Sequence, residues 1–301
     1  MPEDPTQEQR ARVNGVDLAY EVRGTGQPLL FIHGGYGGPA SSLWPGPRLV
    51  WHATTNGFRT INYDRRCAGR SEYVDEPFTL HDIAQDARAL LEQLDATPAV
   101  LVASSAGGPI GLEFVLRWPR LVSALVLVNT GAALMHESPP DLDEPHSSFV
   151  RDRLATVRER AELVRRADDD GMPAAIASRW DEWRSQPPRA SADEHFEDHL
   201  AVQRQALDAL PDDELCAYAA GNIHNMRATL GVDFTTRLGE LRLPTLVAHG
   251  DHDTVVPFEY GQILARRIPD AEFRAFPGAG HGLFSLPEVQ ESVFDWLRSL
   301  D

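Results

Sequence analysis

The segment over residues 99–108 has the sequence AVLVASSAGG, in which five apolar residues lead directly into two serines, an alanine and two glycines. The short apolar run predicts a buried strand over Ala99–Ala103. The residues after it predict a helix to about Arg117, in which Pro109 is tolerated because it falls in the first turn. When a strand passes into a helix through so short a turn, the side chain at the tip of the turn is exposed. That residue is a candidate catalytic residue.

Either Ser104 or Ser105 could be the residue at the tip of this turn. The backbone of such a turn approaches neighbouring strands closely, so it requires small residues two positions before and two positions after the tip. Ser105 has Ala103 and Gly107 at these positions, whereas Ser104 is preceded there by the β-branched Val102. Ser105 is the better candidate for a nucleophile. From these residues alone, a glycine-rich turn that only closes a strand or cradles a phosphate stays open.

Strand and helix patterns alternate along most of the chain, which is typical of a mostly parallel sheet covered by helices. An antiparallel hairpin over residues 12–23, with its turn at Asn14-Gly15, precedes the alternation. Between about residues 136 and 237 charged helical segments replace the strands, which predicts a helical insertion in the core. The other predicted strands cover residues 29–33, 58–63, 124–128, 244–248 and 272–276.

Two helices of the predicted core are amphipathic, one over residues 80–94 and one around residues 293–300. The insertion has an apolar stripe of its own, which predicts that one helix face is buried. This stripe consists of Val150, Leu154, Val157, Ala161 and Val164.

The charge of the 301-residue chain is strongly negative, because 45 acidic residues outnumber 28 basic ones and give a net charge of −17. All 28 basic residues are arginine, which excludes Schiff-base and pyridoxal phosphate enzymes and any phosphate loop that needs a lysine. An acidic surface repels nucleic acid and anionic lipid, so we expect neither nucleic acid nor membrane as a partner. The first ten residues lack the apolar core of a signal peptide, and we expect a cytoplasmic protein.

Glycines also follow the predicted strand at residues 29–33, in the segment His33-Gly34-Gly35. Glycines let backbone N–H groups point into a cavity, and paired N–H groups are what an oxyanion needs. The N–H of Ala106, at the positive end of the helix behind Ser105, would be the second donor.

Two more segments lie just past predicted strands, Gly250–Asp253 and Gly278–His281. Open α/β sheets build their sites at such strand ends. His281 suits proton transfer near neutral pH, and a neighbouring carboxylate would orient its ring. Asp251 and Asp253 are both candidates for that carboxylate.

In these features the chain resembles the α/β-hydrolase fold superfamily, whose D-x-R-G-x-G-x-S turn corresponds to residues 64–71. The resemblance implies an eight-stranded, mostly parallel sheet flanked by helices, with a core over residues 1–135 and 238–301. It also implies a helical cap over residues 136–237, inserted after the sixth strand. The acid of this family stands four residues before a proline, which selects Asp253 because Pro257 follows it.

The resemblance implies a serine hydrolase with Ser105 as nucleophile, His281 as base and Asp253 as acid. The backbone N–H groups of Gly35 and Ala106 would form its oxyanion hole. The reaction would need no metal and no organic cofactor, and the expected substrate is a small or medium hydrophobic ester. Candidate residues for binding that substrate are Tyr36, Ser104, Trp180 and Trp183.

Two residues depart from the family pattern: Cys67 stands where the D-x-R-G turn has glycine, and Ala103 stands where the serine turn has its first glycine. Both departures affect loop geometry more than chemistry. Proline iminopeptidase-like enzymes have H-G-G-P-G, where this chain has Tyr36 in place of the proline. An aminopeptidase of that kind, a lactonase, a carbon–carbon hydrolase and a non-catalytic binding protein of this fold remain alternatives.

Other candidate sites have weaker patterns. His195 and His199 have metal-ligand spacing on a helix, but Phe196 stands where the zinc-protease pattern requires glutamate, which favours a solvated helix face. Cys67 and Cys216 are too few for a disulfide framework or a thiolate metal site. Cys67 is interpreted as a buried turn residue, not as a nucleophile.

Overall fold

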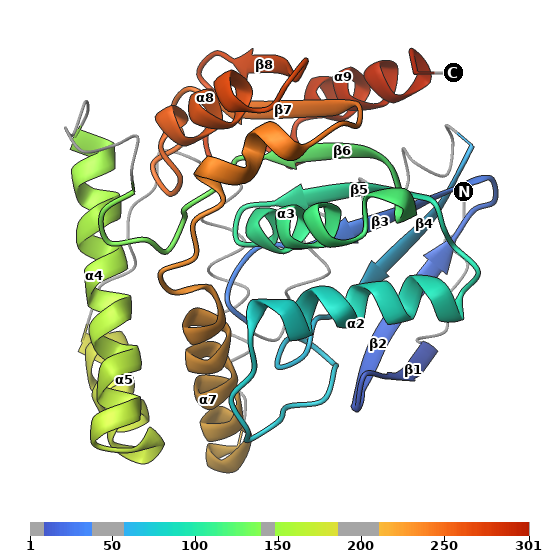
Figure 1. Cartoon of the computed structure of the whole chain (residues 1–301). Coiled ribbons are helices and arrows are strands. Elements are labelled where there is room, and N and C mark those ends of the chain that lie inside the picture. Colours follow the sequence, from blue (N-terminus) through green and yellow to red (C-terminus); the bar gives the residue numbers. More distant parts are fainter. Residues whose placement is uncertain (1–8, 38–56, 140–147, 186–210, 301) are drawn as a thin grey trace.

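A computed structural model describes residues 9–37, 57–139, 148–185 and 211–300. Eight strands form one sheet in the order β1-β2-β4-β3-β5-β6-β7-β8. The pairs β1/β2 and β2/β4 are antiparallel and the other neighbours are parallel, which confirms the predicted sheet (Figure 1). The strands are β1 (Gln9–Val13), β2 (Val16–Arg23), β3 (Gln27–Ile32), β4 (Phe58–Tyr63), β5 (Ala99–Ser104), β6 (Val122–Val128), β7 (Thr245–Gly250) and β8 (Glu272–Phe276).

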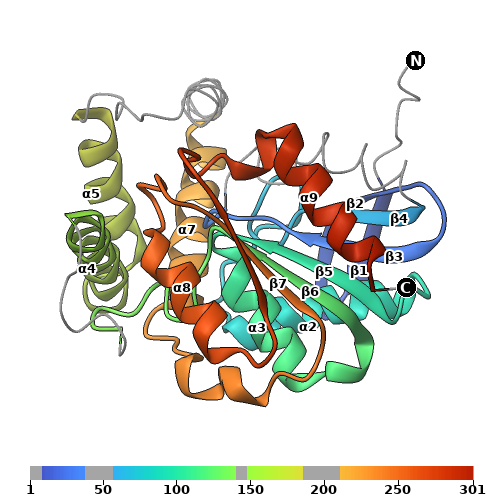
Figure 2. The ribbon, with the colours of Figure 1, turned by 90° about the horizontal axis from the view of Figure 1, so that it is seen from above.

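Alternate residues of the central strands enter two separate cores, because successive side chains of a strand point to opposite faces. Leu30 and Ile32 of β3 pack with helices α2 (Leu80–Gln93), α3 (Gly107–Arg117) and α8 (Phe258–Arg267). Leu29 and Phe31 pack on the other face with α9 (Pro287–Arg298), which crosses the sheet in Figure 2. The sheet is thus covered on both sides, as its continuous apolar strands require. Short 3₁₀ turns lie at Pro119–Leu121, Thr235–Glu240 and Leu283–Ser285.

The segment between β6 and β7 contains the helices α4 (Ser148–Asp169), α5 (Met172–Ser185) and α7 (Asp212–Thr229). In its described residues it has no strand, in agreement with the sequence pattern. The five residues of the predicted apolar stripe on α4 are all buried. The three helices pack around a small core of their own, which joins Val157 and Val164 to Ile176 and Ile223.

None of the helices in the described ranges is both long enough and apolar enough to cross a lipid bilayer. The longest, α4, has 22 residues, and charged side chains occur along its whole length.

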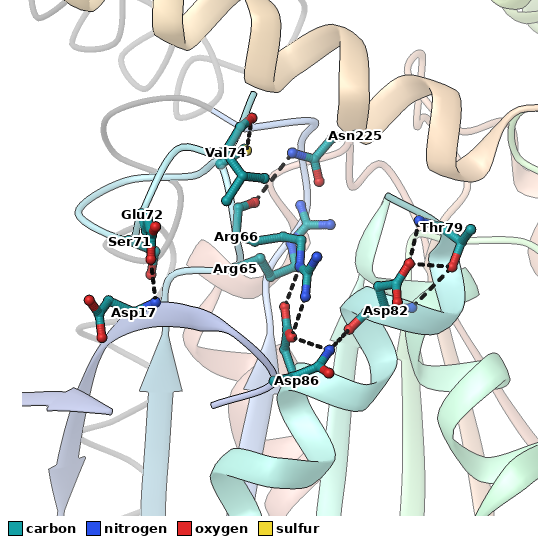
Figure 3. A network of polar contacts seen from close by, with 12 residues as sticks. Asp17, Arg65, Arg66, Ser71, Glu72, Val74, Thr79, Asp82, Asp86 and Asn225 are labelled. Atoms are coloured by element: carbon teal, nitrogen blue, oxygen red, sulfur yellow. Dashed lines mark hydrogen bonds and ion pairs between the residues drawn. The ribbon is translucent and has the colours of Figure 1, made fainter. Parts of the chain in front are cut away.

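Helix α2 begins with a capping box, in which the Thr79 hydroxyl accepts from the Asp82 N–H and the Asp82 carboxylate accepts from the Thr79 N–H (Figure 3). One turn later, Asp86 holds the loop after β4 to this helix. Arg66 donates from Nε and Nη2 to the two carboxylate oxygens of Asp86, at 2.6 Å each. Both side chains are buried, and Asn14 of the β1–β2 turn donates to the same carboxylate at 2.9 Å.

Replacing Asp86 by alanine should lower the free energy of unfolding by about 3–5 kcal/mol, because the Arg66 cation would stay buried without its partner. The double variant Arg66→Met with Asp86→Leu should recover most of this loss, because an apolar pair needs no desolvated charge. Urea unfolding followed by circular dichroism measures both effects. A loss below about 1 kcal/mol for Asp86→Ala would contradict a structural role for the pair.

Candidate active site

The turn between β5 and α3 places Ser105 at the carboxyl end of the sheet. Its φ of 50° lies in the left-handed region, which a serine occupies only when its surroundings enforce it. A side chain on Gly107 would overlap the backbone carbonyls of Ile32 and His33, and one on Gly108 would overlap Thr130. This crowding explains why the turn requires small residues, and it leaves the Ser105 hydroxyl directed away from the strands.

Two loops bring a histidine and a carboxylate to this hydroxyl. The His281 Nε2 lies 3.0 Å from the Ser105 Oγ, and the His281 Nδ1 lies 2.7 Å from the Asp253 Oδ2. His281 follows β8 and Asp253 follows β7, so residues far apart in the sequence meet at one edge of the sheet. Both distances are those of hydrogen bonds, which permits proton transfer from the hydroxyl to the ring.

Asp253 is fixed from both of its oxygens. Oδ2 faces His281, while Oδ1 accepts from the N–H groups of Val255 and Val256 at 2.8 Å each. These backbone donors fix the orientation of the buried carboxylate toward His281. Asp251, the other candidate acid, is exposed and accepts instead from the Gly278 N–H.

Asn129 connects the two loops, a contact that the sequence analysis did not identify. Its Nδ2 donates to the carbonyls of Gly280 and His281 at 3.0 Å, and its Oδ1 accepts from the Gly250 N–H at 3.0 Å. It directly follows β6. The side-chain amide of Asn129 has two N–H donors, which satisfy the backbone carbonyls of Gly280 and His281.

His249 lies behind Asp253 and was also not identified from the sequence. Its Nε2 is 3.8 Å from the Asp253 Oδ2 and donates to the Val256 carbonyl at 2.9 Å. Burial lowers the pKa of His249 below its ordinary value, so the ring is neutral near pH 7. His281, and not His249, is the histidine within hydrogen-bonding distance of this carboxylate.

The loop after β3 passes directly over Ser105. A Cβ on Gly34 would lie 2.8 Å from the Ser105 Cβ and 3.4 Å from its Oγ, so only glycine permits this approach. Gly35 has a φ of +72° and is exposed. Ala106 directly follows Ser105 and is the N-cap residue of α3, so its backbone N–H lies at the start of this helix.

The structure places the four predicted substrate-binding residues in different surroundings. Ser104 is the last residue of β5 and is half-buried. Tyr36 packs against the core of α4, α5 and α7, its carbonyl accepts from Asn222 at 2.7 Å, and the Arg160 guanidinium lies 5.0 Å from its ring. Trp180 and Trp183 belong to α5, but their side chains lie outside the described part of the structure.

Cys67 takes the glycine position of its turn with a φ of 55°, so the cysteine adopts the left-handed backbone that glycine adopts easily. It is fully buried, and its Sγ accepts from the Val74 N–H at 3.3 Å. The prediction of a buried turn residue is confirmed.

The described residues contain no group of three or more side chains arranged to hold a metal ion. His195, Phe196 and His199 lie outside these residues.

A family model described as the alpha/beta hydrolase fold matches residues 27–286. The chain belongs to this family. A non-heme chloroperoxidase of Kitasatospora aureofaciens is 27% identical over 286 residues, which cover 92% of this chain and 93% of the relative. A putative carbamate hydrolase of Variovorax paradoxus is 32% identical and covers 88% and 89% of the two chains. Among solved structures, an esterase from Thermogutta terrifontis superposes with a TM-score of 0.67 at 26% identity, covering 98% and 99%.

The two cysteines should differ in their reaction with iodoacetamide. Burial raises the pKa of the Cys67 thiol to about 11, which leaves only about one thiol in a thousand ionised at pH 8. Cys216 is exposed. Mass spectrometry of the native protein should show one alkylated cysteine, and of the urea-unfolded protein two. Alkylation of Cys67 in the folded protein would contradict its buried, protonated state.

Proposed function

We propose that this protein is a serine hydrolase that cleaves the carboxylic ester of a small or medium hydrophobic substrate. The observation that carries the proposal is the continuous chain of hydrogen bonds from the Ser105 Oγ through His281 to Asp253. In such a chain the histidine removes the hydroxyl proton while the carboxylate holds the ring and stabilises the imidazolium.

The reaction begins when the Ser105 Oγ attacks the acyl carbonyl and His281 Nε2 takes its proton. Negative charge then develops on the carbonyl oxygen, which the N–H groups of Gly35 and Ala106 stabilise. Each such donor contributes roughly 3–4 kcal/mol in comparable sites. His281 returns its proton to the leaving alcohol, and an acyl ester remains on Ser105. A water molecule activated by the same ring then releases the acid and restores the serine.

The proposal assigns residues 136–237 to a cap that covers the bound substrate. Two contacts support it: the packing of Tyr36 against the helices of this segment, and the hydrogen bond from Asn222 of α7 to the Tyr36 carbonyl. Tyr36 follows the proposed oxyanion donor Gly35 directly, so substrate groups that extend toward the cap would meet its ring. We propose Tyr36, Ser104, Trp180 and Trp183 as the residues that line this region.

The relatives include an esterase and a putative carbamate hydrolase, and these names favour acyl transfer. They do not identify which bond of the substrate is cleaved. Aryl, methyl and lactone esters, aminoacyl amides and carbamates, assayed as one panel, would separate these activities. Halide oxidation belongs in the same panel, because another relative is named as a chloroperoxidase. We expect the aryl ester to be cleaved fastest, because its leaving group needs least protonation.

Replacing Ser105 by alanine should reduce kcat for p-nitrophenyl acetate by at least about 10³-fold, since the nucleophile is lost. Ser104→Ala is the matched comparison, because it leaves the hydrogen-bonded chain intact. Ser104 is proposed to line the substrate region, so its loss should change KM more than kcat. Circular dichroism should show that both variants are folded. If Ser104→Ala lost activity and Ser105→Ala retained it, the nucleophile would be Ser104 and not Ser105.

A fluorophosphonate provides a second test that does not depend on the natural substrate. It should add to the tryptic peptide that contains Ser105, and the Asp253→Asn variant should react more slowly because its histidine is held less well. A wild-type protein that hydrolyses nothing in the panel and stays unmodified after long exposure would favour a binding protein of this fold.

A further inference from the structure

Arg65 lies in the turn after β4 and is only 1% exposed. The other two arginines of this turn are paired with carboxylates: Arg66 with Asp86, and Arg70 with Asp64 and Glu21. Arg65 pairs with no carboxylate of the described residues. Burial of a cation without an opposite charge is unfavourable, so this arginine requires an explanation that its neighbours do not.

The donors of Arg65 point toward the loop that passes over Ser105. Its Nη2 donates to the Gly34 carbonyl at 3.2 Å and to the Gly35 carbonyl at 2.6 Å. Its backbone N–H donates to the His33 Nε2 at 3.3 Å, and its Nε lies 3.4 Å from the same nitrogen. The side chain is therefore bound to three successive residues of this loop.

The ring of His33 completes the contact. Burial and the nearby Arg65 charge lower the pKa of His33 well below its ordinary value, so the ring is neutral. With Nε2 accepting from Arg65, Nδ1 bears the proton and donates to the Gly34 carbonyl at 2.7 Å. The Gly34 carbonyl thus accepts two hydrogen bonds on the side of the loop that faces Arg65.

This arrangement determines where the Gly35 N–H points. The Gly34 carbonyl and the Gly35 N–H belong to one peptide unit, and in a planar trans peptide these two groups point in opposite directions. A donor that holds the carbonyl on one side therefore directs the N–H to the other side. A cationic donor also polarises the peptide and strengthens the hydrogen bond that its N–H donates.

We propose that Arg65 is a positioning residue for the oxyanion hole, which orients and polarises the Gly34–Gly35 peptide so that its N–H holds the developing oxyanion. This inference rests on the proposed ester hydrolysis at Ser105. Burial lowers the pKa of Arg65 only to about 10, so the guanidinium stays charged at neutral pH. Among the described residues Arg65 has no carboxylate partner, and the proposed reaction would supply a negative charge, that of the tetrahedral intermediate.

Three variants separate charge from hydrogen bonding. Arg65→Met removes both, Arg65→Gln keeps a neutral donor, and Arg65→Lys keeps the charge without the planar fork. Loss of a complete oxyanion donor lowers kcat about 10²–10³-fold, so misdirecting one should lower it by about 10- to 100-fold in Arg65→Met and Arg65→Gln. Arg65→Lys should retain more activity than either, and KM should change less than about threefold because the ground state does not need the oxyanion contact.

Inhibitor binding tests the role independently of turnover. A trifluoromethyl ketone adds to the serine and forms an oxyanion, whereas the matching methyl ketone binds mainly as the neutral carbonyl. The Arg65 variants should weaken binding of the first compound in parallel with the fall in kcat/KM and leave binding of the second unchanged. A residue that only supported the fold would affect both compounds alike.

Arg70→Gln is the matched control, because Arg70 belongs to the same turn and donates to the carboxylates of Asp64 and Glu21, whereas Arg65 donates to the carbonyls of Gly34 and Gly35. It should lower the urea midpoint while leaving kcat unchanged. If Arg65→Met and Arg65→Gln do not fold, the role of Arg65 is tested with Arg65→Lys alone. We expect its kcat to be about threefold or more below that of the wild type.

The outcomes separate the two proposals. Unchanged kcat in the folded Arg65 variants, or equal weakening of both ketones, would overturn the role of Arg65 while leaving the hydrolase in place. A wild-type protein that neither cleaves esters nor binds the trifluoromethyl ketone would overturn the proposed function and this role together.

Discussion

At Ser105 the backbone adopts a left-handed conformation while three neighbouring segments pack so tightly that no side chain fits at Gly34, Gly107 or Gly108. This crowding lets the ends of β3 and β5 and the start of α3 meet around one serine. It brings the loop over residues 33–35 so close to Ser105 that a Cβ on Gly34 would overlap the Ser105 Cβ. A larger residue at any of these glycines would push the loop away and separate the hydroxyl from the N–H groups that the proposed reaction needs.

Buried charges lie on two sides of this serine and have opposite signs. On one side Asp253 is held by two backbone N–H groups beside the neutral His249. On the other side Arg65 is held by the glycine loop beside the neutral His33. In the proposed reaction a cation forms on His281, next to the carboxylate, and an anion forms at the Gly35 N–H, on the opposite side of the Gly34–Gly35 peptide from the guanidinium. The fixed charges therefore match the direction in which charge separates, and neither needs to move when the reaction occurs.

Much of the fold could be predicted from the sequence because the signals were local. The strand at residues 58–63 and the hairpin turn at Asn14-Gly15 were predicted with the observed bounds, since apolar runs and turn residues act over a few positions. Ser105 was selected over Ser104 by the size of its neighbours alone. The choice of Asp253 over Asp251 needed the family pattern, because both aspartates stand in the same loop with no local feature to separate them.

Arg65, His249 and Asn129 could not be predicted in the same way, because their roles depend on what surrounds them in space. The turn after β4 contains three arginines, and nothing in the sequence distinguishes the one without a carboxylate from the two that have one. The counter-charges of Arg66 and Arg70 come from α2, from the turn itself and from β2, segments that are placed only by the packing of the sheet. The absence of a partner for Arg65 in the described residues likewise depends on the complete tertiary arrangement.

The loop after β3, which includes the proposed oxyanion donor Gly35, is also joined to α7, one of the helices after β6. In the proposed reaction this contact would link substrate binding to catalysis. Asn222 donates to the Tyr36 carbonyl, and three residues further along α7 Asn225 donates to the Arg66 carbonyl in the turn that contains Arg65 (Figure 3). A side chain on Gly37 would overlap the Cys67 carbonyl, so the loops after β3 and β4 also touch each other. Any shift of α7 on substrate binding would therefore reach both the Gly35 N–H and the arginine behind it. If the proposed cap and oxyanion hole are correct, changes in these helices should affect kcat together with KM, because the segment proposed to select the substrate would also hold the peptide proposed to stabilise the transition state.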